Sequence, residues 1–171
     1  MTRVLLTGLS GTGKSRLIEQ FAVLGYKAVD LDSDEWSEWV GVHFEGEPTS
    51  GDSPVERNRD WVWREERVQA LLSVQETGIL FVAGCAANMV KFRPRFDSII
   101  LLTAPDAVTV ERLLMRDNNQ YGKRPEELAR VLAQREVIEP KLRTLANYEI
   151  DTSASLDEVV RKILEVVKQT G

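Results

Sequence analysis

The residues that this sequence has little of narrow its class. Cysteine and histidine occur once each, as Cys85 and His43, in 171 residues. A lone cysteine cannot form an internal disulfide and is typical of a reducing compartment, so the sequence favours the cytoplasm. No apolar run reaches the 18 residues that suggest a membrane-spanning helix, and few apolar residues precede Gly8. We therefore expect no secretion signal and no membrane partner.

Basic runs are also lacking. Lysine and arginine number 22 against 27 aspartates and glutamates, which gives a net charge of −5. A chain without a basic stretch offers little to nucleic-acid phosphates, so we expect no nucleic-acid partner. The length fits one domain, 1–171, that buries roughly 70% of the surface its unfolded chain would expose. We expect a monomer or a weak homodimer.

Short apolar runs alternate with longer segments of helical period. Most of the runs lack polar alternation, as do strands that are buried on both faces. This pattern predicts an α/β fold in which helices cover a parallel sheet. The five expected strands are 3–7, 26–32, 78–84, 98–104 and 148–152.

The segments between the expected strands carry apolar stripes at helical spacing. At the start of the last stripe, Ser155 and Glu158 are spaced as a capping box. Turn-forming residues dominate 46–54 and 116–125, which we expect to be loops. The stripes are Leu17, Ile18, Phe21 and Ala22; Val68, Leu71 and Leu72; Leu128, Val131, Leu132, Leu142 and Leu145; and Leu156, Val159, Val160, Ile163, Leu164 and Val167.

The strongest motif is "GLSGTGKS" (8–15), which fits G-x-x-x-x-G-K-[ST] between an expected strand and an expected helix. Glycines let backbone N–H groups surround a phosphate, because no side chain blocks the approach and φ can be positive. The helix N-terminus attracts the phosphate, Lys14 can reach the β and γ phosphates, and the Ser15 hydroxyl can bind Mg²⁺. A dinucleotide fingerprint fails because Arg16 stands where its third glycine belongs. The predicted ATP-binding residues here are Gly8, Gly11, Thr12, Gly13, Lys14 and Ser15.

A second group of cationic residues favours an enzyme over a nucleotide-operated switch. Arg112 and Arg116 are four residues apart, so they share a helix face, and Lys123 and Arg124 follow in a glycine-containing loop able to close. Phosphoryl transfer needs such donors because charge spreads over the moving phosphoryl oxygens. The alternative is a solvated basic helix end. The GTPase patterns D-x-x-G and N-K-x-D do not occur in the chain.

The chain resembles the shikimate kinase and nucleoside monophosphate kinase group of small P-loop kinases over nearly its whole length, and it is most similar to the shikimate-kinase-like branch. That resemblance implies a P-loop sandwich with a five-stranded parallel sheet in the order 2-3-1-4-5, a lid at about 116–125 and an acceptor-binding region at about 33–64. The matching pieces are "GLSGTGKS", "LDSD" (31–34), "WR" (63–64), "AGC" (83–85), "KRP" (123–125), "EPKLR" (139–143) and "IDTS" (150–153).

The resemblance also implies roles for individual residues. It assigns Asp32 to magnesium through water, and it assigns Arg112 and Ser153 to the adenine of ATP. It assigns the acceptor to Asp34, Arg64 and Gly84. The catalytic residues that it implies are Lys14, Asp34, Arg116 and Arg124.

Three positions depart from the shikimate kinase pattern. This chain has Ala83-Gly84-Cys85 where that group has three glycines, Ile138 where it has an acceptor-binding arginine, and Arg67 where it has a glutamate. A carboxylate-bearing acceptor would lose one bidentate partner at Ile138. Four tryptophans near the acceptor region form either an aromatic wall for a flat substrate or helix packing: Trp36, Trp39, Trp61 and Trp63. His43 is expected to be solvated, and Cys85 to be packed rather than nucleophilic.

The stretch "VDLDSDEW" (29–36) places three carboxylates at alternate positions. In an extended strand they would share one face and repel each other unless a cation lay opposite. We expect Asp30 to end a strand and to be structural, and Asp32 and Asp34 to meet magnesium and the acceptor hydroxyl where open α/β sheets bind ligands. The alternative is a solvated acidic turn before a helix that begins at Asp34 and Glu35.

The sequence thus predicts an ATP- and Mg²⁺-dependent phosphotransferase that acts on a small molecule bearing a hydroxyl or a phosphate. A nucleoside monophosphate kinase and a non-catalytic nucleotide switch or ATPase remain alternatives. The acceptor is left open, because the segments that would shape its pocket are the least similar to the family.

Overall fold

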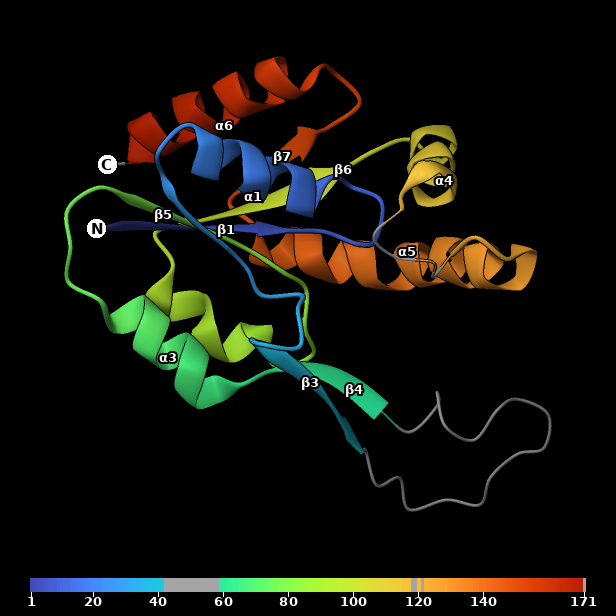
Figure 1. The fold of residues 1–171 in the computed structure, drawn as a ribbon, viewed down its shortest axis with the longest axis horizontal. Helices are drawn as coiled ribbons and strands as arrows, with labels where there is room; N and C mark the ends of the chain where they lie inside the picture. The colour runs from blue at the N-terminus through green and yellow to red at the C-terminus, as the bar shows by residue number, and fades with distance from the viewer. Residues whose placement is uncertain (42–58, 118–119, 121, 171) are drawn as a thin grey trace.

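A computed structural model describes residues 1–41, 59–117, 120 and 122–170 (Figure 1). Its main sheet has five parallel strands in the order β2-β5-β1-β6-β7, which is 2-3-1-4-5 when these five are numbered along the chain. Both the α/β class and the expected strand order are therefore confirmed. The strands are β1 (Thr2–Thr7), β2 (Lys27–Asp30), β5 (Ile79–Ala83), β6 (Ser98–Thr103) and β7 (Tyr148–Asp151).

Helices cover both faces of the sheet. The first and last helices, α1 (Lys14–Val23) and α6 (Leu156–Thr170), lie on one face. The other face is covered by α3 (Glu65–Ser73), the short 3₁₀ helix η1 (Met89–Arg95) and α5 (Pro125–Leu145). In Figure 1 the strands of the sheet run toward the right, where α4 (Asp106–Met115) lies beyond their carboxyl ends.

Each strand supplies two hydrophobic cores, because successive side chains point to opposite faces of a sheet. On β1, Val4 and Leu6 pack against α1 and α6, whereas Leu5 packs against α3 and its neighbours. The same division holds on β6, where Ile100 faces the first core and Ile99 faces the second. Burial on both faces explains why these strands read as continuous apolar runs in the sequence.

Most residues of the predicted helical stripes pack in the two cores, but Ala22 is exposed, and Leu128 and Leu132 are half-buried and belong to neither core. At the start of α6 the backbone N–H of Glu158 donates to Ser155 Oγ at 3.3 Å, which bears out the capping position of that serine. Among the described residues, no helix is both long and apolar enough to cross a membrane.

A two-stranded antiparallel sheet departs from the sequence prediction. Its strands, β3 (Ser37–Gly41) and β4 (Arg59–Trp63), project away from the main sheet in Figure 1. The alternative reading of an acidic turn before a helix is right about the turn and wrong about the helix: Asp34 and Glu35 lie exposed in a turn, and the strand β3 follows. Trp39 opposes Trp61 across the pair, and aromatic cross-strand pairs of this kind stabilise antiparallel strands. His43 and the expected loop at 46–54 lie outside the described residues.

Candidate functional site

The loop between β1 and α1 has the conformation that its glycines make possible. Gly11 and Gly13 have φ values of 82° and 92°, in the left-handed region that other residues rarely adopt. Gly11 also lies close to α4, since a β-carbon there would come within 2.9 Å of Thr109 Cγ2. The predicted glycines are therefore needed both for the turn of the loop and for the approach of α4.

The side chains of Lys14 and Thr12 close this loop from inside. Lys14 Nζ donates to the carbonyl oxygens of Gly8 at 2.6 Å and Leu9 at 3.2 Å. Thr12 is buried, and its Oγ1 donates to the Leu9 carbonyl at 2.8 Å. Thr12 thus supports the loop from below, while its backbone carbonyl accepts a hydrogen bond from Thr152 Oγ1 at 2.7 Å.

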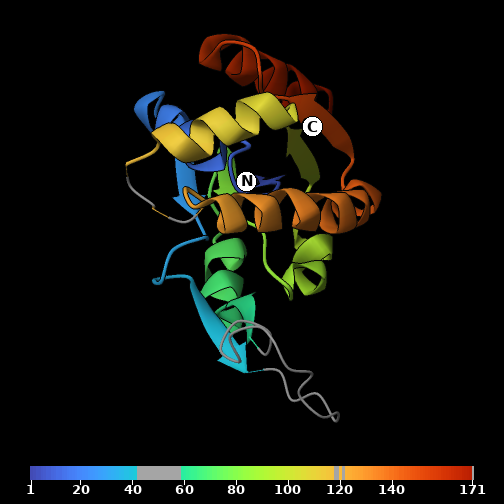
Figure 2. The ribbon, with the colours of Figure 1, turned by 90° about the vertical axis from the view of Figure 1, so that its right-hand side faces the viewer.

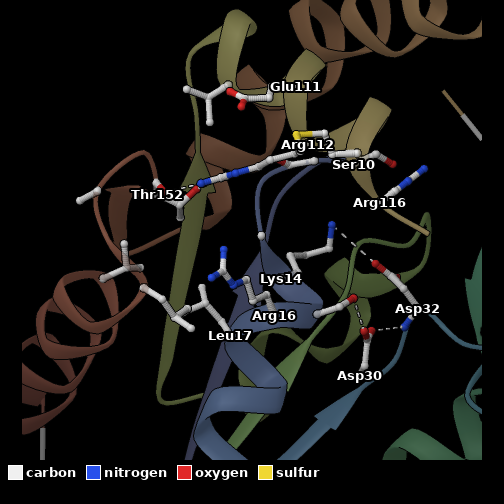
Figure 3. Close-up of a pocket in the computed structure, with 18 residues that line it drawn as sticks. Ser10, Lys14, Arg16, Leu17, Asp30, Asp32, Glu111, Arg112, Arg116 and Thr152 are labelled. Atoms are coloured by element: carbon white, nitrogen blue, oxygen red, sulfur yellow. Dashed lines mark hydrogen bonds and ion pairs between the residues drawn. The ribbon is translucent and has the colours of Figure 1, made fainter. Parts of the chain in front are cut away.

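A cavity of about 820 Å³ lies above the loop at the carboxyl ends of the strands (Figure 3). Its walls come from four parts of the chain: the loop with the start of α1, the end of β2, one face of α4 and the connection from β7 to α6. Figure 2, which views the right-hand side of Figure 1, shows α4 crossing this end of the molecule. Volumes of 300–1,000 Å³ are typical of small-molecule sites.

Asp30 is part of this cavity, which corrects the expectation that it is only structural. It ends β2 as predicted, but its Oδ2 accepts a hydrogen bond from Ser15 Oγ at 2.6 Å. Its Oδ1 accepts the backbone N–H of Asp32 at 2.9 Å. Asp30 is therefore the carboxylate in contact with the serine that the sequence assigns to Mg²⁺.

Asp32 lies beside Lys14, with Oδ2 of the carboxylate 3.7 Å from Nζ of the lysine. Its Oδ1 accepts the backbone N–H of Cys85 at 3.0 Å. Burial raises the pKa of Asp32 above its ordinary value, and Lys14 and the Cys85 N–H oppose that shift. Asp32 is thus a partly desolvated carboxylate that points into the cavity (Figure 3).

The predicted acceptor residue Asp34 is not brought to the cavity. It is exposed in the turn after Asp32, and it does not belong to the cavity lining. Its backbone carbonyl is 3.4 Å from Arg64 Nε, and the Arg64 guanidinium pairs with Glu38 of β3 at 3.0 Å. The alternation of the three acids ends with β2, because the chain turns at 32–36 before it becomes extended again. The acidic pair at the site is therefore Asp30 and Asp32.

Arg112 of α4 joins the α4 wall of the cavity to the connection between β7 and α6. Its guanidinium donates to Thr152 Oγ1 at 2.8 Å, to the Thr152 carbonyl and to the Gly11 carbonyl at 3.3 Å. Burial lowers the pKa of Arg112, and the nearby charge of Arg16 lowers it further. Ser153, which was predicted to contact the adenine together with Arg112, is exposed and donates its backbone N–H to Asp151, whereas its neighbour Thr152 lines the cavity. The "IDTS" segment (150–153) therefore reaches the cavity through Thr152, and adenine contact by Arg112 and Ser153 stays a prediction.

Of the predicted lid residues, Arg116 reaches the cavity. It follows α4 directly, lines the cavity and has a pKa that burial lowers. Arg124 is the exposed residue that precedes α5, and neither it nor Lys123 is part of the lining. Positions 118, 119 and 121 of the predicted lid lie outside the described residues.

Gly84 is required by the close approach of an aromatic side chain. A β-carbon on Gly84 would lie 3.1 Å from Trp63 Nε1 and 3.2 Å from Leu31 Cβ. Trp63 is 1% exposed, so this tryptophan is core packing, although it lies on a strand rather than a helix. Cys85 is half-buried, and burial raises the pKa of its thiol, which agrees with a packed residue.

The oxygen donors at the site suit magnesium. Mg²⁺ prefers oxygen ligands and keeps several waters, binding through one or two protein oxygens together with substrate phosphates. Ser15, Asp30 and Asp32 supply such oxygens next to the loop. Across the described residues, no cluster of three or more histidine, cysteine or carboxylate groups forms an all-protein metal cage.

Comparison with protein families gives one match. The family model described as an AAA domain matches residues 4–135, more than half of the chain. The matched part runs from β1 into α5, so it includes the loop at 8–15, Asp30 and Asp32, and the arginines Arg112 and Arg116. A comparison with curated proteins gave no match.

Solved structures resemble the whole chain at low sequence identity. A shikimate kinase from Acinetobacter baumannii in complex with shikimate has a TM-score of 0.63 and 16% identity, over 99% of this chain and 94% of that one. The shikimate kinase from Bacteroides thetaiotaomicron has a TM-score of 0.59 and 18% identity, over 98% of each chain. A gluconokinase from Sinorhizobium meliloti 1021 has a TM-score of 0.52 and 19% identity, over 98% and 92%. These similarities show the fold.

Proposed function

The chain belongs to the AAA-domain family whose model it matches, and from that premise we propose that it is a small-molecule kinase, which transfers the γ-phosphoryl group of ATP to a hydroxyl group. The expected resemblance to small P-loop kinases holds at the level of the fold. A fold does not imply an activity, so the proposal depends on the chemistry of the cavity.

The observation that carries the proposal is a second set of charged groups opposite the phosphate-binding loop. A nucleotide-binding protein needs the loop, Lys14 and Ser15. This cavity also contains Arg112 and Arg116 from α4 and the partly desolvated carboxylate of Asp32. Cationic groups that surround a transferring phosphoryl, next to a carboxylate that can take a proton, are what phosphoryl transfer to a hydroxyl requires.

The loop would bind the phosphates of ATP. Backbone N–H groups of 8–15 and the N-terminus of α1 attract the phosphates, and Lys14 would exchange its carbonyl partners for the β and γ phosphate oxygens. Ser15 would bind Mg²⁺, with Asp30 orienting the serine hydroxyl. Mg²⁺ supplies charge stabilisation for the phosphoryl oxygens. We thus assign the carboxylate that supports Mg²⁺ binding to Asp30 instead of Asp32.

Asp32 would then act as the general base in place of Asp34. The acceptor hydroxyl gives its proton to the Asp32 carboxylate as its oxygen forms a bond to the γ-phosphorus. The bond between that phosphorus and the β–γ bridging oxygen breaks, and ADP leaves. A desolvated carboxylate with a raised pKa is a stronger base than an ordinary one. Arg116 would stabilise the charge that spreads over the moving phosphoryl group, while Arg112 stays bonded to Thr152 and Gly11 in the wall of the cavity.

The proposal is tested by ATP consumption in the presence of candidate acceptors. The panel contains shikimate, gluconate, nucleosides, nucleoside monophosphates and aminocyclitols. A kinase consumes ATP faster when its acceptor is added, whereas a switch or a simple ATPase does not respond. Lys14→Ala should abolish any stimulated rate, because the lysine would bind the phosphates and belongs to neither hydrophobic core.

A further inference from the structure

The Thr152 hydroxyl connects α4 to the loop at 8–15. We infer that Thr152 is a positioning residue for phosphate binding: its hydroxyl orients the peptide group between Thr12 and Gly13, so that the Gly13 N–H can donate to a phosphate. The inference rests on the proposed function, because it takes the loop to bind the phosphates of a nucleotide. It adds a residue that lies outside the loop motif, about 140 positions further along the chain.

Thr152 contacts three parts of the structure through one oxygen atom. The residue is 4% exposed and directly follows β7. Its Oγ1 accepts a hydrogen bond from Arg112 NH1 at 2.8 Å, and Figure 3 shows the Arg112 guanidinium directed at Thr152. The same oxygen lies 2.7 Å from the Thr12 carbonyl oxygen and 3.2 Å from the Thr103 carbonyl oxygen.

The single proton of this hydroxyl belongs to the bond with Thr12. A hydroxyl can donate only once. The Thr103 carbonyl is the more distant of the two and already accepts the backbone N–H of Thr152 at 2.8 Å. In the described part of the chain, the Thr12 carbonyl has no other donor. The guanidinium of Arg112 polarises the hydroxyl, which strengthens the bond that the hydroxyl donates.

The bond to the Thr12 carbonyl orients the peptide group that this carbonyl shares with Gly13. Among the described residues no peptide bond is cis, and the C=O and N–H of a planar trans peptide point in opposite directions. The Gly13 N–H therefore points away from Thr152. No described group accepts this N–H, and Gly13 lines the cavity. An N–H of this kind is available to a phosphate oxygen.

Gly13 needs such a constraint because its own backbone is permissive. Its φ of 92° is accessible to glycine, which has no side chain to limit rotation. The side chains of Thr12 and Lys14 bond to carbonyls nearer the start of the loop, so they do not hold this peptide group. The described side chain that does so is Thr152.

The test compares two substitutions at one position. Thr152→Val has nearly the same shape as threonine but no hydroxyl, and Thr152→Ser is the matched control that keeps the hydroxyl. Calorimetric titration measures the dissociation constants of ATP and of inorganic tripolyphosphate, each with Mg²⁺. Thr152→Val should raise both constants about tenfold, the effect of one well-oriented hydrogen bond to a charged group. Thr152→Ser should bind both ligands as the wild type does.

Tripolyphosphate separates the positioning of the loop from other effects of the hydroxyl, because it has phosphates but no base or ribose. If Thr152→Val weakens the binding of ATP but not of tripolyphosphate, the hydroxyl acts on the nucleoside through Arg112, and the inference is wrong. Unchanged constants in Thr152→Val, or an equal loss in Thr152→Ser, also overturn it.

A measurement on the wild type gives a result even if Thr152→Val does not fold. The amide proton resonance of Gly13 should move downfield when tripolyphosphate binds, because the N–H then donates to a phosphate oxygen. A resonance that does not move contradicts the inference.

The inference and the kinase proposal can fail separately. If ATP and tripolyphosphate bind with the expected losses in Thr152→Val but no acceptor stimulates ATP consumption, the kinase proposal fails and the positioning role is supported. If acceptors stimulate ATP consumption but Thr152→Val binds both ligands as the wild type does, only the inference fails. A wild-type chain that binds neither ligand refutes both.

Discussion

The Asp32 carboxylate has to be ionised to act as a base, but its environment favours the neutral, protonated form. As the proposed base it has to be ionised, yet the protein has partly removed it from water. Lys14 and the backbone N–H of Cys85 compensate only in part for that loss, since the pKa of Asp32 remains raised. The residue therefore gains basicity at the expense of stability.

Asp32→Asn should lower the rate of acceptor-stimulated ATP consumption by roughly 10² to 10⁴, which is the usual contribution of a positioned base. The affinity for ATP should change little. Asp34→Asn is the matched control, because it removes a carboxylate two residues away that does not line the cavity. Steady-state kinetics of the two variants distinguish them. Equal losses would show that the base has been assigned to the wrong residue.

The same substitution should change stability in a pH-dependent way. A carboxyl group whose pKa is higher in the folded state binds its proton more tightly there, so its contribution favours folding at low pH. That contribution is lost as the pH rises through the raised pKa. Asp32→Asn should therefore melt at a higher temperature than wild type near neutrality, and the difference should shrink toward acidic pH. Thermal melting across pH 3.5 to 7.5 measures this, and a wild type that is more stable at neutral pH would contradict it.

At the scale of elements, α4 is positioned by α5 and by the loop together. Arg135 of α5 is 17% exposed and bonds to Asp106 at 2.7 Å, to the Ala104 carbonyl and to Glu139 of its own helix at 3.0 Å. Its NH1 is also 3.5 Å from Thr109 Oγ1, and the methyl group of the same threonine leaves no room for a side chain at Gly11. The largely buried guanidinium of Arg135 thus fixes the start of α4, the helix that carries Arg112 and is followed by Arg116.

Arg135→Gln should weaken ATP binding as well as stability. Losing a charged partner in such a network costs about 1–3 kcal/mol, and α4 would shift relative to the loop. Arg143→Gln is a suitable control, because Arg143 bonds to Glu139 and Glu149 but not to α4. We expect both variants to have a lower melting temperature than wild type, but only Arg135→Gln to raise the KM for ATP severalfold. Equal KM values in the two variants would show that Arg135 has no positioning role.

Elements differ in how well the sequence predicts them. The parallel strands and the loop were predictable, because burial on both faces and glycine geometry impose residue types directly. The β3–β4 pair was not, because each strand is stabilised mainly by the other across the intervening segment 42–58. The position of Asp34 was predicted wrongly for a different reason. Alternation fixes the direction of a side chain only while the strand continues, and β2 ends at Asp30.

At the scale of the whole molecule, the order of the elements fixes the nucleotide site but not the acceptor. The loop, α4 and Thr152 belong to the part of the fold that surrounds the carboxyl ends of the central strands. Specificity for the acceptor would depend on individual side chains, which the order of the elements does not determine. For this reason a shared fold with shikimate kinases and a gluconokinase leaves the acceptor to be determined from the residues.

Nucleotide binding should therefore stabilise the whole chain. A ligand present at 100 times its dissociation constant stabilises a protein by about 2.7 kcal/mol, so ATP with Mg²⁺ should raise the melting temperature. Lys14→Ala should lose most of this shift. Lys27→Ala should keep it, because Lys27 pairs with Glu76 outside the cavity. Thermal shift titration compares the two, and an equal response would contradict the assignment of the loop.

The most direct measurement is phosphorus NMR of ATP turnover with each acceptor class of the panel present in turn. The account predicts a phosphate-ester resonance that grows with ADP, requires the acceptor and nearly disappears in Asp32→Asn. If inorganic phosphate is the only new product with every acceptor class tested, the chain hydrolyses ATP without transferring the phosphoryl group, and the central claim is wrong.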